Sequence, residues 1–249
     1  MKAYSDFAYV YDRLMCDVDY EARTEYILKL FNKYGKKPSL LLDLACGTGG
    51  FSVQMAKHGI EVIGVDMSEE MLGMARENAI DSGSDVLFLC QRAEELDLYG
   101  TVDGAICCMD SLNHITDIKD LEKAVSKVSL FLEEDCLFIF DVNTVYKHEK
   151  VLGDNTFVID EDGVYCVWQN EYDPTTKITN IMLDFFVETE DGAYERFGED
   201  FCERAYTREE LKCILEQSGL TLLAVLGDMT ECEPESCCER EIYIAKKKG

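Results

Sequence analysis

Residues 40–50 of the chain read LLLDLACGTGG, an apolar run that leads through an acid into a glycine-rich loop. The apolar run predicts a buried β-strand over residues 39–45, and the spacing over residues 51–58 predicts a helix. Between them, Gly47 and Gly49 let the backbone approach a ligand closely, and the helix that follows presents free N–H groups to an anion. This stretch therefore predicts a ligand-binding loop in an α/β fold.

A second strand carries a second acid. Residues 60–66 read IEVIGVD, and Asp66 at the end of this run follows Asp43 by 23 positions (66 − 43). An acid at this place can accept hydrogen bonds from both hydroxyl groups of a ribose. Ser68 is a suitable N-cap for a helix over residues 69–79.

Strands and helices continue to alternate through the rest of the first half. Such alternation predicts a parallel sheet with helices on both faces. The further elements expected here are strands at residues 86–89, 102–109 and 136–141 and helices at residues 5–34 and 118–132.

The pattern changes after residue 144, where strand-like runs are separated by turn signals such as Asp191-Gly192. The helical pattern returns at Thr207, which can form a capping box with Glu210. We therefore expect a cofactor-binding domain of residues 1–144 and 206–249, with an inserted antiparallel β-rich subdomain over residues 145–205 that supplies substrate walls or a dimer surface. The expected strands are 156–159, 165–169, 178–186 and 194–197 in the insert, and 220–226 and 241–245 after it.

The glycine loop has two rival ligands, a nicotinamide or flavin dinucleotide and S-adenosylmethionine. A dinucleotide site favours glycine at the third position of GxGxxG, where this chain has Ser52, and it does not require Asp43. An acid just before the loop suits a ligand that carries an ammonium group and a positive sulfonium. The combination of these features with Asp66 therefore favours S-adenosylmethionine.

These motifs resemble those of class I S-adenosylmethionine-dependent methyltransferases over nearly the full chain. Residues 43–49 (DLACGTG) look like the glycine motif of that family, and residues 64–72 (GVDMSEEML) look like its ribose motif. The chain is also similar to a β-insert group that includes the deoxyamino-sugar N,N-dimethyltransferases, and to an uncharacterised cytosolic bacterial branch that shares residues 140–147 (FDVNTVYK). The resemblance implies a Rossmann-like, seven-stranded α/β methyltransferase fold with an inserted antiparallel β subdomain, and S-adenosyl-L-methionine as the cofactor.

The resemblance also implies binding roles at matching positions. The loop from Ala45 through Gly47 to Gly49 would pass the methionine moiety, and Asp43 would lie near its ammonium group. Asp66 would take the ribose. The further cofactor contacts expected are Met67, which would pack on the adenine, together with Met71, Ala93, Glu94 and Met109.

The adenine end departs from the family pattern. Arg92 stands where the family often has an aspartate that accepts a hydrogen bond from the adenine amino group. Arginine has no acceptor atom. We therefore expect the backbone around Ala93 and Glu94 to read the adenine.

Two residues are candidates for the chemistry. Methyl transfer mainly requires positioning, and orientation alone can contribute about 7–11 kcal/mol. His114, just after the fourth strand, can accept a proton from an amine or hydroxyl near neutral pH, although it can equally cap or pack. Tyr11 looks like the N-terminal tyrosine that closes over the cofactor in this family, although it can equally be an aromatic of the first helix.

The charge of the chain bears on its substrate. The formal net charge is -26 and the pI is near 4.3. Such an acidic surface repels phosphate backbones, which makes nucleic acid an unlikely partner. We expect a small-molecule acceptor, and a homodimer is an open alternative to a monomer.

The cysteines and the start of the chain bear on its compartment. Twelve cysteines are present, and the start of the sequence does not look like a signal peptide. We expect Cys90, Cys107 and Cys136 to be small core residues in a reducing cytoplasm. We expect no metal site, since Cys232, Cys237 and Cys238 form no CxxC pair, and no apolar run is long enough for a membrane span.

The sequence thus predicts a cytoplasmic methyltransferase that acts on nitrogen or oxygen of a small metabolite. Two alternatives stay open: a cofactor-binding sensor or assembly partner that has lost catalysis, and an enzyme directed at RNA or the ribosome. The acidic charge argues against the RNA alternative.

Overall fold

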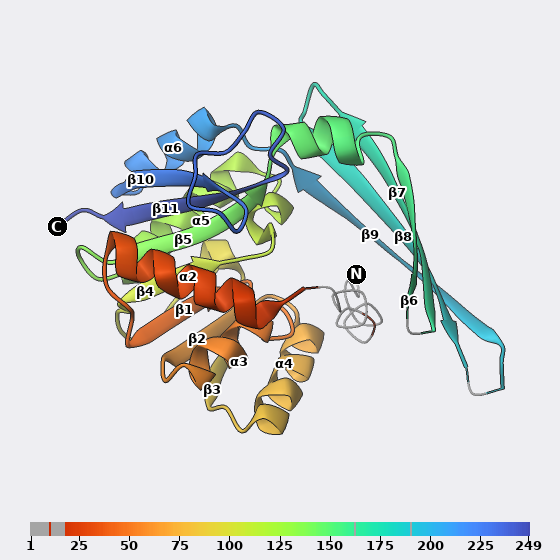
Figure 1. Ribbon diagram of the computed structural model, residues 1–249, viewed down its shortest axis with the longest axis horizontal. Helices are drawn as coiled ribbons and strands as arrows, with labels where there is room; N and C mark the ends of the chain where they lie inside the picture. Colours follow the sequence, from red (N-terminus) through yellow and green to blue (C-terminus); the bar gives the residue numbers. More distant parts are fainter. Residues whose placement is uncertain (1–9, 11–17, 162, 190) are drawn as a thin grey trace.

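The protein is built around one seven-stranded sheet (Figure 1). The computed structural model describes residue 10 and residues 18–161, 163–189 and 191–249. The strand order is β10-β11-β5-β4-β1-β2-β3, in which β1 to β5 are parallel and β11 is antiparallel to both neighbours. These strands are β1 Leu40–Leu44, β2 Glu61–Asp66, β3 Val86–Cys90, β4 Gly104–Cys107, β5 Leu137–Asn143, β10 Leu220–Gly227 and β11 Arg240–Lys247.

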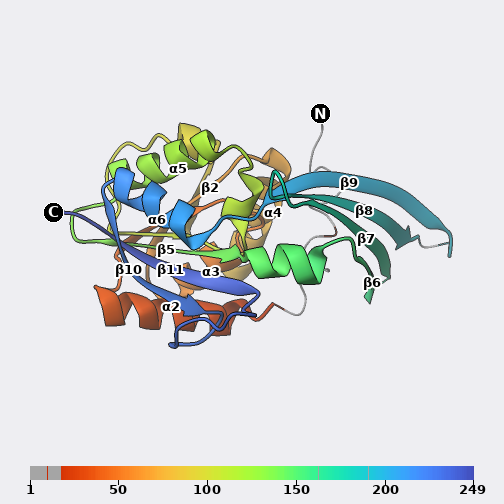
Figure 2. The ribbon, with the colours of Figure 1, turned by 90° about the horizontal axis from the view of Figure 1, so that it is seen from above.

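Helices cover both faces of this sheet (Figure 2). α2 (Tyr20–Tyr34) and α3 (Gly50–Lys57) share one buried cluster with the sheet, whereas α5 (Ile118–Phe131) and α6 (Arg208–Gln217) share the other. α4 (Glu69–Ser82) contacts α3 and β3. All residues of β5 are buried, as expected for a parallel strand covered on both faces.

A second sheet follows the fifth strand and projects from the main body as a curved antiparallel meander (Figure 1). Its buried face carries Cys166, Ile181 and Phe185, which form one apolar cluster with Val10 and with Met71 of α4. The insert therefore packs back toward the main domain through apolar contacts. Its strands are β6 Thr156–Glu161, β7 Val164–Asp173, β8 Ile178–Glu188 and β9 Tyr194–Arg204.

These sheets confirm the expected fold class, a seven-stranded α/β sheet with an inserted antiparallel sheet. The predicted caps are present too. Ser68 Oγ accepts a hydrogen bond from the backbone N–H of Met71, and Thr207 forms the capping box with Glu210. The domain boundaries at residues 144/145 and 205/206 stay a prediction.

Some predictions about single elements are wrong. The fourth strand is shorter than the predicted 102–109, because Met109 has a φ of 58° and left-handed backbone cannot continue a strand. The π-helical turn η3 (Lys147–Leu152) was not predicted. Cys107 and Cys136 are buried as expected, but Cys90 is exposed at the end of the edge strand β3.

Two other predictions concern the N-terminal helix and membrane spans. α2 begins at Tyr20, where Asp19 accepts a hydrogen bond from the N–H of Ala22; except for residue 10, the predicted helical residues 5–17 lie outside the described part of the chain. Among the helices in the described ranges, none is long and apolar enough to cross a membrane.

Candidate cofactor and acceptor site

A pocket lies where the order of the parallel strands reverses. The chain runs outward from β1 through β2 to β3 on one side and through β4 to β5 on the other, so the loops that follow β1 and β4 diverge at the carboxyl edge. Ligands of doubly wound sheets bind at this place. A cavity of about 290 Å³ opens here, close to the lower end of the range for small-ligand sites, roughly 300 to 1,000 Å³.

Most of the predicted site residues meet at this cavity. Two of the described residues, Asp43 and Gly49, do not line it. Tyr11, predicted both as a cofactor contact and as a catalytic residue, lies outside the described residues. The predicted residues that line the cavity are Ala45, Gly47, Asp66, Met67, Met71, Ala93, Glu94, Met109 and His114.

The two glycines of the loop serve different needs. Both have left-handed backbone, with φ of 55° at Gly47 and 80° at Gly49. A Cβ on Gly47 would meet no atom within 4 Å, so its open side faces space that a ligand can use. A Cβ on Gly49 would lie 3.1 Å from the Cβ of Ala75 and 3.2 Å from the ring of Phe88. Gly49 therefore allows close packing of the loop on α4 and β3, and its role in binding the cofactor stays a prediction.

Asp43 is held inside the protein. It is buried, and its Oδ2 accepts a hydrogen bond of 2.6 Å from the buried hydroxyl of Ser52. Burial raises the pKa of Asp43 to about 7, against an ordinary value of 3.8. Ser52 stands where a dinucleotide site favours glycine, and its hydroxyl is the hydrogen-bond donor for the buried carboxyl of Asp43.

Asp66 ties the two strand ends together. Its Oδ2 accepts from the N–H of Gly47 and its Oδ1 from the N–H of Ser68, both at 2.9 Å. Burial raises the pKa of Asp66, and these backbone N–H groups and the nearby His114 oppose the rise. Each carboxylate oxygen still has a second lone pair, so Asp66 can accept two further hydrogen bonds from ligand hydroxyls.

The far end of the cavity is partly apolar. The side chain of Met67 is 53% exposed, which leaves a large apolar surface at the cavity for a flat ring to cover. Arg92 pairs with Glu94 within the loop after β3, and Gln91 holds that loop by two hydrogen bonds to the backbone of Asp97. The Arg92 guanidinium is thus occupied by Glu94. Recognition of the adenine by the backbone of Ala93 and Glu94 stays a prediction.

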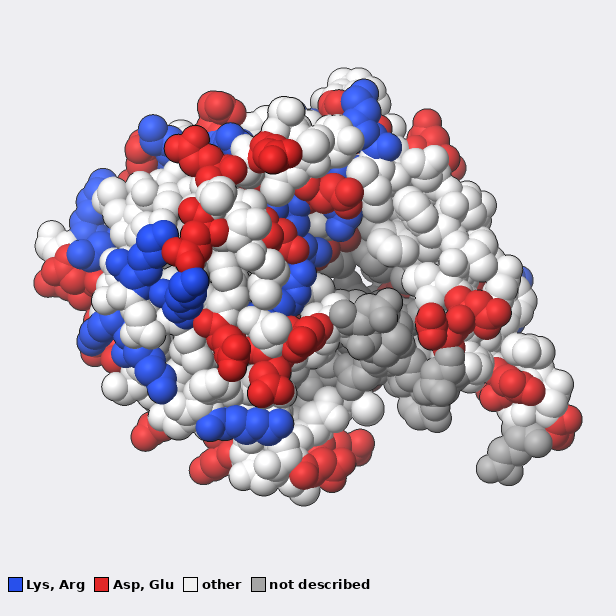
Figure 3. Space-filling model, viewed as in Figure 1, with Lys and Arg blue, Asp and Glu red and all other residues white. Residues whose placement is uncertain are grey.

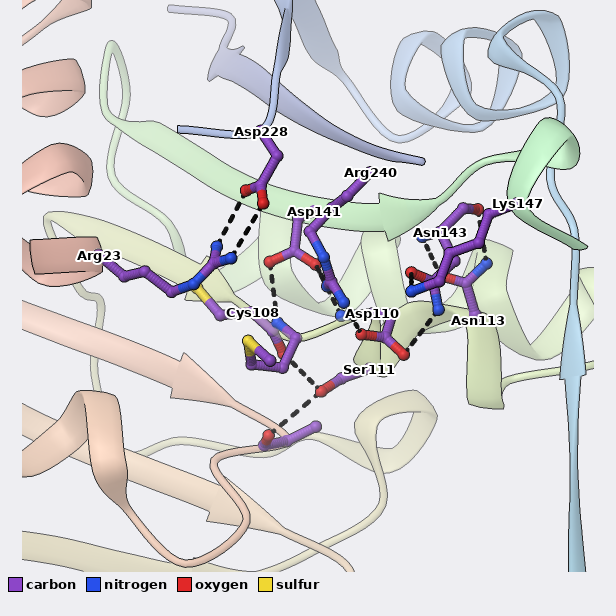
Figure 4. Close-up of polar contacts among 12 residues, drawn as sticks. Arg23, Cys108, Asp110, Ser111, Asn113, Asp141, Asn143, Lys147, Asp228 and Arg240 are labelled. Carbon is purple, nitrogen blue, oxygen red and sulfur yellow. Dashed lines mark hydrogen bonds and ion pairs between the residues drawn. The ribbon is translucent and has the colours of Figure 1, made fainter. Parts of the chain in front are cut away.

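The loop after β4 forms the opposite wall and is held by ion pairs (Figure 4). Met109 and Asp110 both have left-handed backbone. The carboxylate of Asp141 on β5 accepts both of their N–H groups, at 2.8 and 2.7 Å, and Arg240 of β11 pairs with the carboxylates of Asp141 and Asp110. Burial raises the pKa of Asp110, but Arg240, Lys147 and His114 outweigh it and lower the pKa to about 2. The loop therefore carries a permanent carboxylate.

The same loop presents His114 at the cavity and connects it to the insert. Asn113 in the short helix η2 (Ser111–His114) donates to the backbone carbonyls of Asn143 and Arg204, and so joins β5 to the end of β9. Asp110, His114 and Glu203 bring one ligand atom each within 4.8 Å of one another. This group is the one set of metal-capable side chains found among the described residues. The absence of a metal stays a prediction.

Sequence reasoning missed Asp141, Arg240 and Glu203. Asp141 lies inside the shared FDVNTVYK stretch, which could have marked it, because Asn143, Thr144 and Lys147 of that stretch also make polar contacts at the end of β5. Arg240 and Glu203 lie far along the chain in ordinary-looking strands, and no local pattern marks either of them.

The parallel strands β1 to β5 bring a glycine loop and a ribose-type acid to one cavity. This arrangement defines a nucleoside-binding α/β protein. Comparison with known proteins narrows the class. A family profile described as "Methyltransferase domain" matches residues 41–135. A protein named "Putative methyltransferase YqeM", from Bacillus subtilis strain 168, is 34% identical over 246 residues, which is 98% of this chain and 97% of that protein. The chain therefore belongs to the methyltransferase family.

Solved structures of methyltransferases have the same fold as this chain. The crystal structure of an S-adenosylmethionine-dependent methyltransferase from Clostridium acetobutylicum ATCC 824 superimposes with a TM-score of 0.90 at 34% identity, over 99% of each chain. The sugar N-methyltransferase KedS8 from Streptoalloteichus sp. ATCC 53650 shares the fold, with a TM-score of 0.79 at 16% identity over 97% of this chain and 93% of that one. The protein is an S-adenosylmethionine-dependent methyltransferase, and S-adenosylmethionine is its cofactor.

The cavity suits this cofactor. The space above Gly47 is free of protein atoms, Asp66 keeps acceptor capacity for hydroxyl groups, and Met67 offers an exposed apolar surface. These are the features that a methionine chain, a ribose and an adenine require.

The assignment of Asp66 to the ribose can be tested against that of His114. We expect Asp66→Ala to weaken S-adenosylmethionine binding by about 10- to 100-fold, because hydrogen bonds to a charged group contribute roughly 1.5–3 kcal/mol. His114→Ala should change the affinity by less than about threefold, within the roughly 0.5 kcal/mol expected of a change that removes no such contact. Titration calorimetry on both variants measures this, and equal losses would contradict the assignment.

Asp43 predicts a pH dependence of stability. Because its pKa in the folded protein is about 7 and its ordinary value is 3.8, the folded protein holds a proton that the unfolded chain releases between these values. The free energy of unfolding should therefore fall as the pH rises from 5 to 7, by on the order of 1 kcal/mol per pH unit from this group. Asp43→Asn removes the titration and should flatten the curve measured by urea unfolding. Asp85→Asn, at an exposed aspartate, is the matched control. A slope that is the same in both variants would rule out a raised pKa.

Proposed function

We propose that the protein methylates an amine nitrogen of a small molecule, and that His114 accepts the proton that this nitrogen loses. The observation that carries the proposal is the place of His114: it lines the cofactor cavity and lies beside the carboxylates of Asp110 and Glu203. A candidate base that lines the cofactor cavity thus has two acidic groups beside it.

The chain's residues divide the work between binding and proton transfer. S-adenosylmethionine supplies a methyl group on a positively charged sulfur. Gly47 gives the backbone room for the methionine chain, Asp66 accepts from the ribose, and Met67 covers the adenine. These roles fit the free space, the lone pairs and the exposed surface at the three positions.

A base is needed because an amine is an ammonium ion near neutral pH. The nitrogen must lose a proton before its lone pair can form the new bond to the methyl carbon, while the electrons of the broken bond return to sulfur. Histidine titrates in the range that suits this transfer. The side chain of His114 is partly exposed at the cavity, so an acceptor can reach it.

The charge around His114 favours an amine over an alcohol. Asp110 is ionised because Arg240, Lys147 and His114 together lower its pKa to about 2 despite its burial. Asp66 also interacts electrostatically with the histidine. A cationic acceptor is attracted into such a place. The fold shared with the sugar N-methyltransferase KedS8 supports the same acceptor atom.

A small molecule suits the surface better than a nucleic acid does. On the face shown in Figure 3, acidic side chains are interspersed with the basic ones. Together with the net charge of -26, this arrangement would oppose a phosphate backbone that approached this face.

The proposal can be tested before the acceptor is known. A bacterial extract is filtered, and the protein is incubated with methyl-tritiated S-adenosylmethionine and either the small-molecule filtrate or the macromolecules that the filter retains. Half of the extract is first treated with acetic anhydride to block amines and then with hydroxylamine to free any acylated oxygens. We expect the blocked extract to accept at least about tenfold less label, and His114→Asn to transfer label about 100-fold more slowly, as general-base catalysis typically contributes 10²–10⁴-fold.

Each other outcome has a defined meaning. Equal labelling of blocked and unblocked extracts would show an oxygen acceptor. Labelling only in the fraction that the filter retains would show a macromolecular substrate. Tight cofactor binding without transfer to either fraction would favour a sensor.

A further inference from the structure

Glu203 is an acid that the cofactor site does not explain. It lies one residue before the end of β9, is 4% exposed, and reaches from the insert to the edge of the main domain. Its Oε1 is 3.7 Å from Nε2 of His114, and its Oε2 is 3.7 Å from Nε2 of His148. Asn143 donates a hydrogen bond of 3.3 Å to Oε2. Glu203 thus lies between two imidazole rings.

A buried carboxylate needs compensating groups, because its desolvation is unfavourable. In the described part of the chain, the basic groups within ion-pair distance of Glu203 are the two histidines. Burial raises the pKa of Glu203 and the nearby Asp110 adds to the rise, whereas His114, Asn143 and Lys147 oppose it. The ionised form of Glu203 is therefore most favourable when a histidine beside it carries a proton.

His148 cannot readily be that histidine. Its ring is fully buried in η3, and burial lowers its pKa to about 4. Its Nδ1 lies 2.8 Å from the hydroxyl of Thr179, and its Nε2, on the side of Glu203, has no hydrogen-bond partner. A neutral ring that accepts from Thr179 would direct its Nε2 proton at Glu203.

His114 is the ring that can respond. It is partly exposed at the cavity, its Nε2 is the atom next to Glu203, and its ring packs on that of Phe201 with 5.1 Å between centroids. A carboxylate beside one nitrogen of a histidine keeps the proton on that nitrogen, so the other nitrogen is left as the base. The acidic groups that face His114 are Asp66, Asp110 and Glu203. The titratable groups that face Glu203 are Asp110, His114, Lys147 and His148.

We propose that Glu203 is the positioning residue for His114: it orients the ring with the Nε2 proton toward the insert, leaves Nδ1 to accept the proton of the acceptor, and stabilises the imidazolium that results. The inference rests on the proposed function, in which His114 is the base. Its consequence is that the insert contributes directly to the chemistry, since Glu203 comes from β9.

The tautomer of His114 tests this contact without any acceptor and without a change to Glu203. The chain has three histidines, so ring nitrogen shifts in a ¹⁵N-labelled protein can be assigned with single His→Gln changes. We expect neutral His114 to carry its proton on Nε2. A proton on Nδ1 would overturn the proposal.

Titration of the same rings gives a second test. In Glu203→Gln, the midpoint of the His114 titration should move to lower pH, because the imidazolium loses the carboxylate beside its Nε2. His58, the C-cap residue of α3, should show no change, and neither should His114 in the control Glu195→Gln, at an exposed position of β9. An unchanged His114 midpoint in a folded Glu203→Gln protein would overturn the proposal.

Activity gives the third readout. With the amine-containing extract, Glu203→Gln should lower kcat on the order of 10- to 100-fold and shift the acidic limb of its pH profile to lower pH. The KM for S-adenosylmethionine should stay unchanged, and Glu203→Asp should recover part of kcat. If EDTA abolished transfer and Zn²⁺ restored it, the group of Asp110, His114 and Glu203 would be a metal site and the proposal would fail.

The two proposals can fail separately. Full methyl transfer by His114→Asn would refute His114 as the base, whatever the tautomer. An Nδ1 proton or an unmoved titration would refute the role of Glu203 even if His114→Asn were inactive.

Discussion

The site depends on two ion pairs, which Arg240 at the start of β11 makes with Asp141 of β5 and with Asp110 just after β4. Two consecutive residues, Met109 and Asp110, adopt left-handed backbone, at a cost of roughly 1–2 kcal/mol each for residues other than glycine. Asp141 offsets this by accepting both N–H groups, since hydrogen bonds to a charged group contribute roughly 1.5–3 kcal/mol. The turn at the end of β4 is therefore fixed before any ligand binds.

The turn at the end of β4 connects the cofactor loop to the insert. On one side, Ser111 donates to the carbonyl of Cys108 and lies 3.5 Å from the carbonyl of Ala45, which connects the turn to the glycine loop. On the other side, Asn113 binds backbone carbonyls of β5 and of the end of the insert. The cofactor loop and the insert are thus held at defined positions on either side of the turn, which suits a reaction that depends on orientation more than on strong acids or bases.

Local patterns were enough to predict the strands, the caps and the residues of the glycine and ribose loops, because strand, loop and acid follow one another within about 30 residues in a unit of this kind. They did not show that the missing side chain of Gly49 makes room for Ala75 and Phe88. Nor could they find Arg240, which meets Asp110 across 130 positions of the chain. Such contacts depend on how distant strands pair, and the sequence carries no periodic sign of them.

The central claim is that the turn after β4 places the proton acceptor beside the cofactor. A crystal structure of the protein with S-adenosylhomocysteine tests it most directly. The account predicts that the ribose hydroxyls bind Asp66 and that the sulfur faces the His114 side of the cavity, with the loop around Met109 and Asp110 unchanged from its present backbone. A sulfur that faced away from His114, or a turn that rearranged to admit the cofactor, would contradict the account.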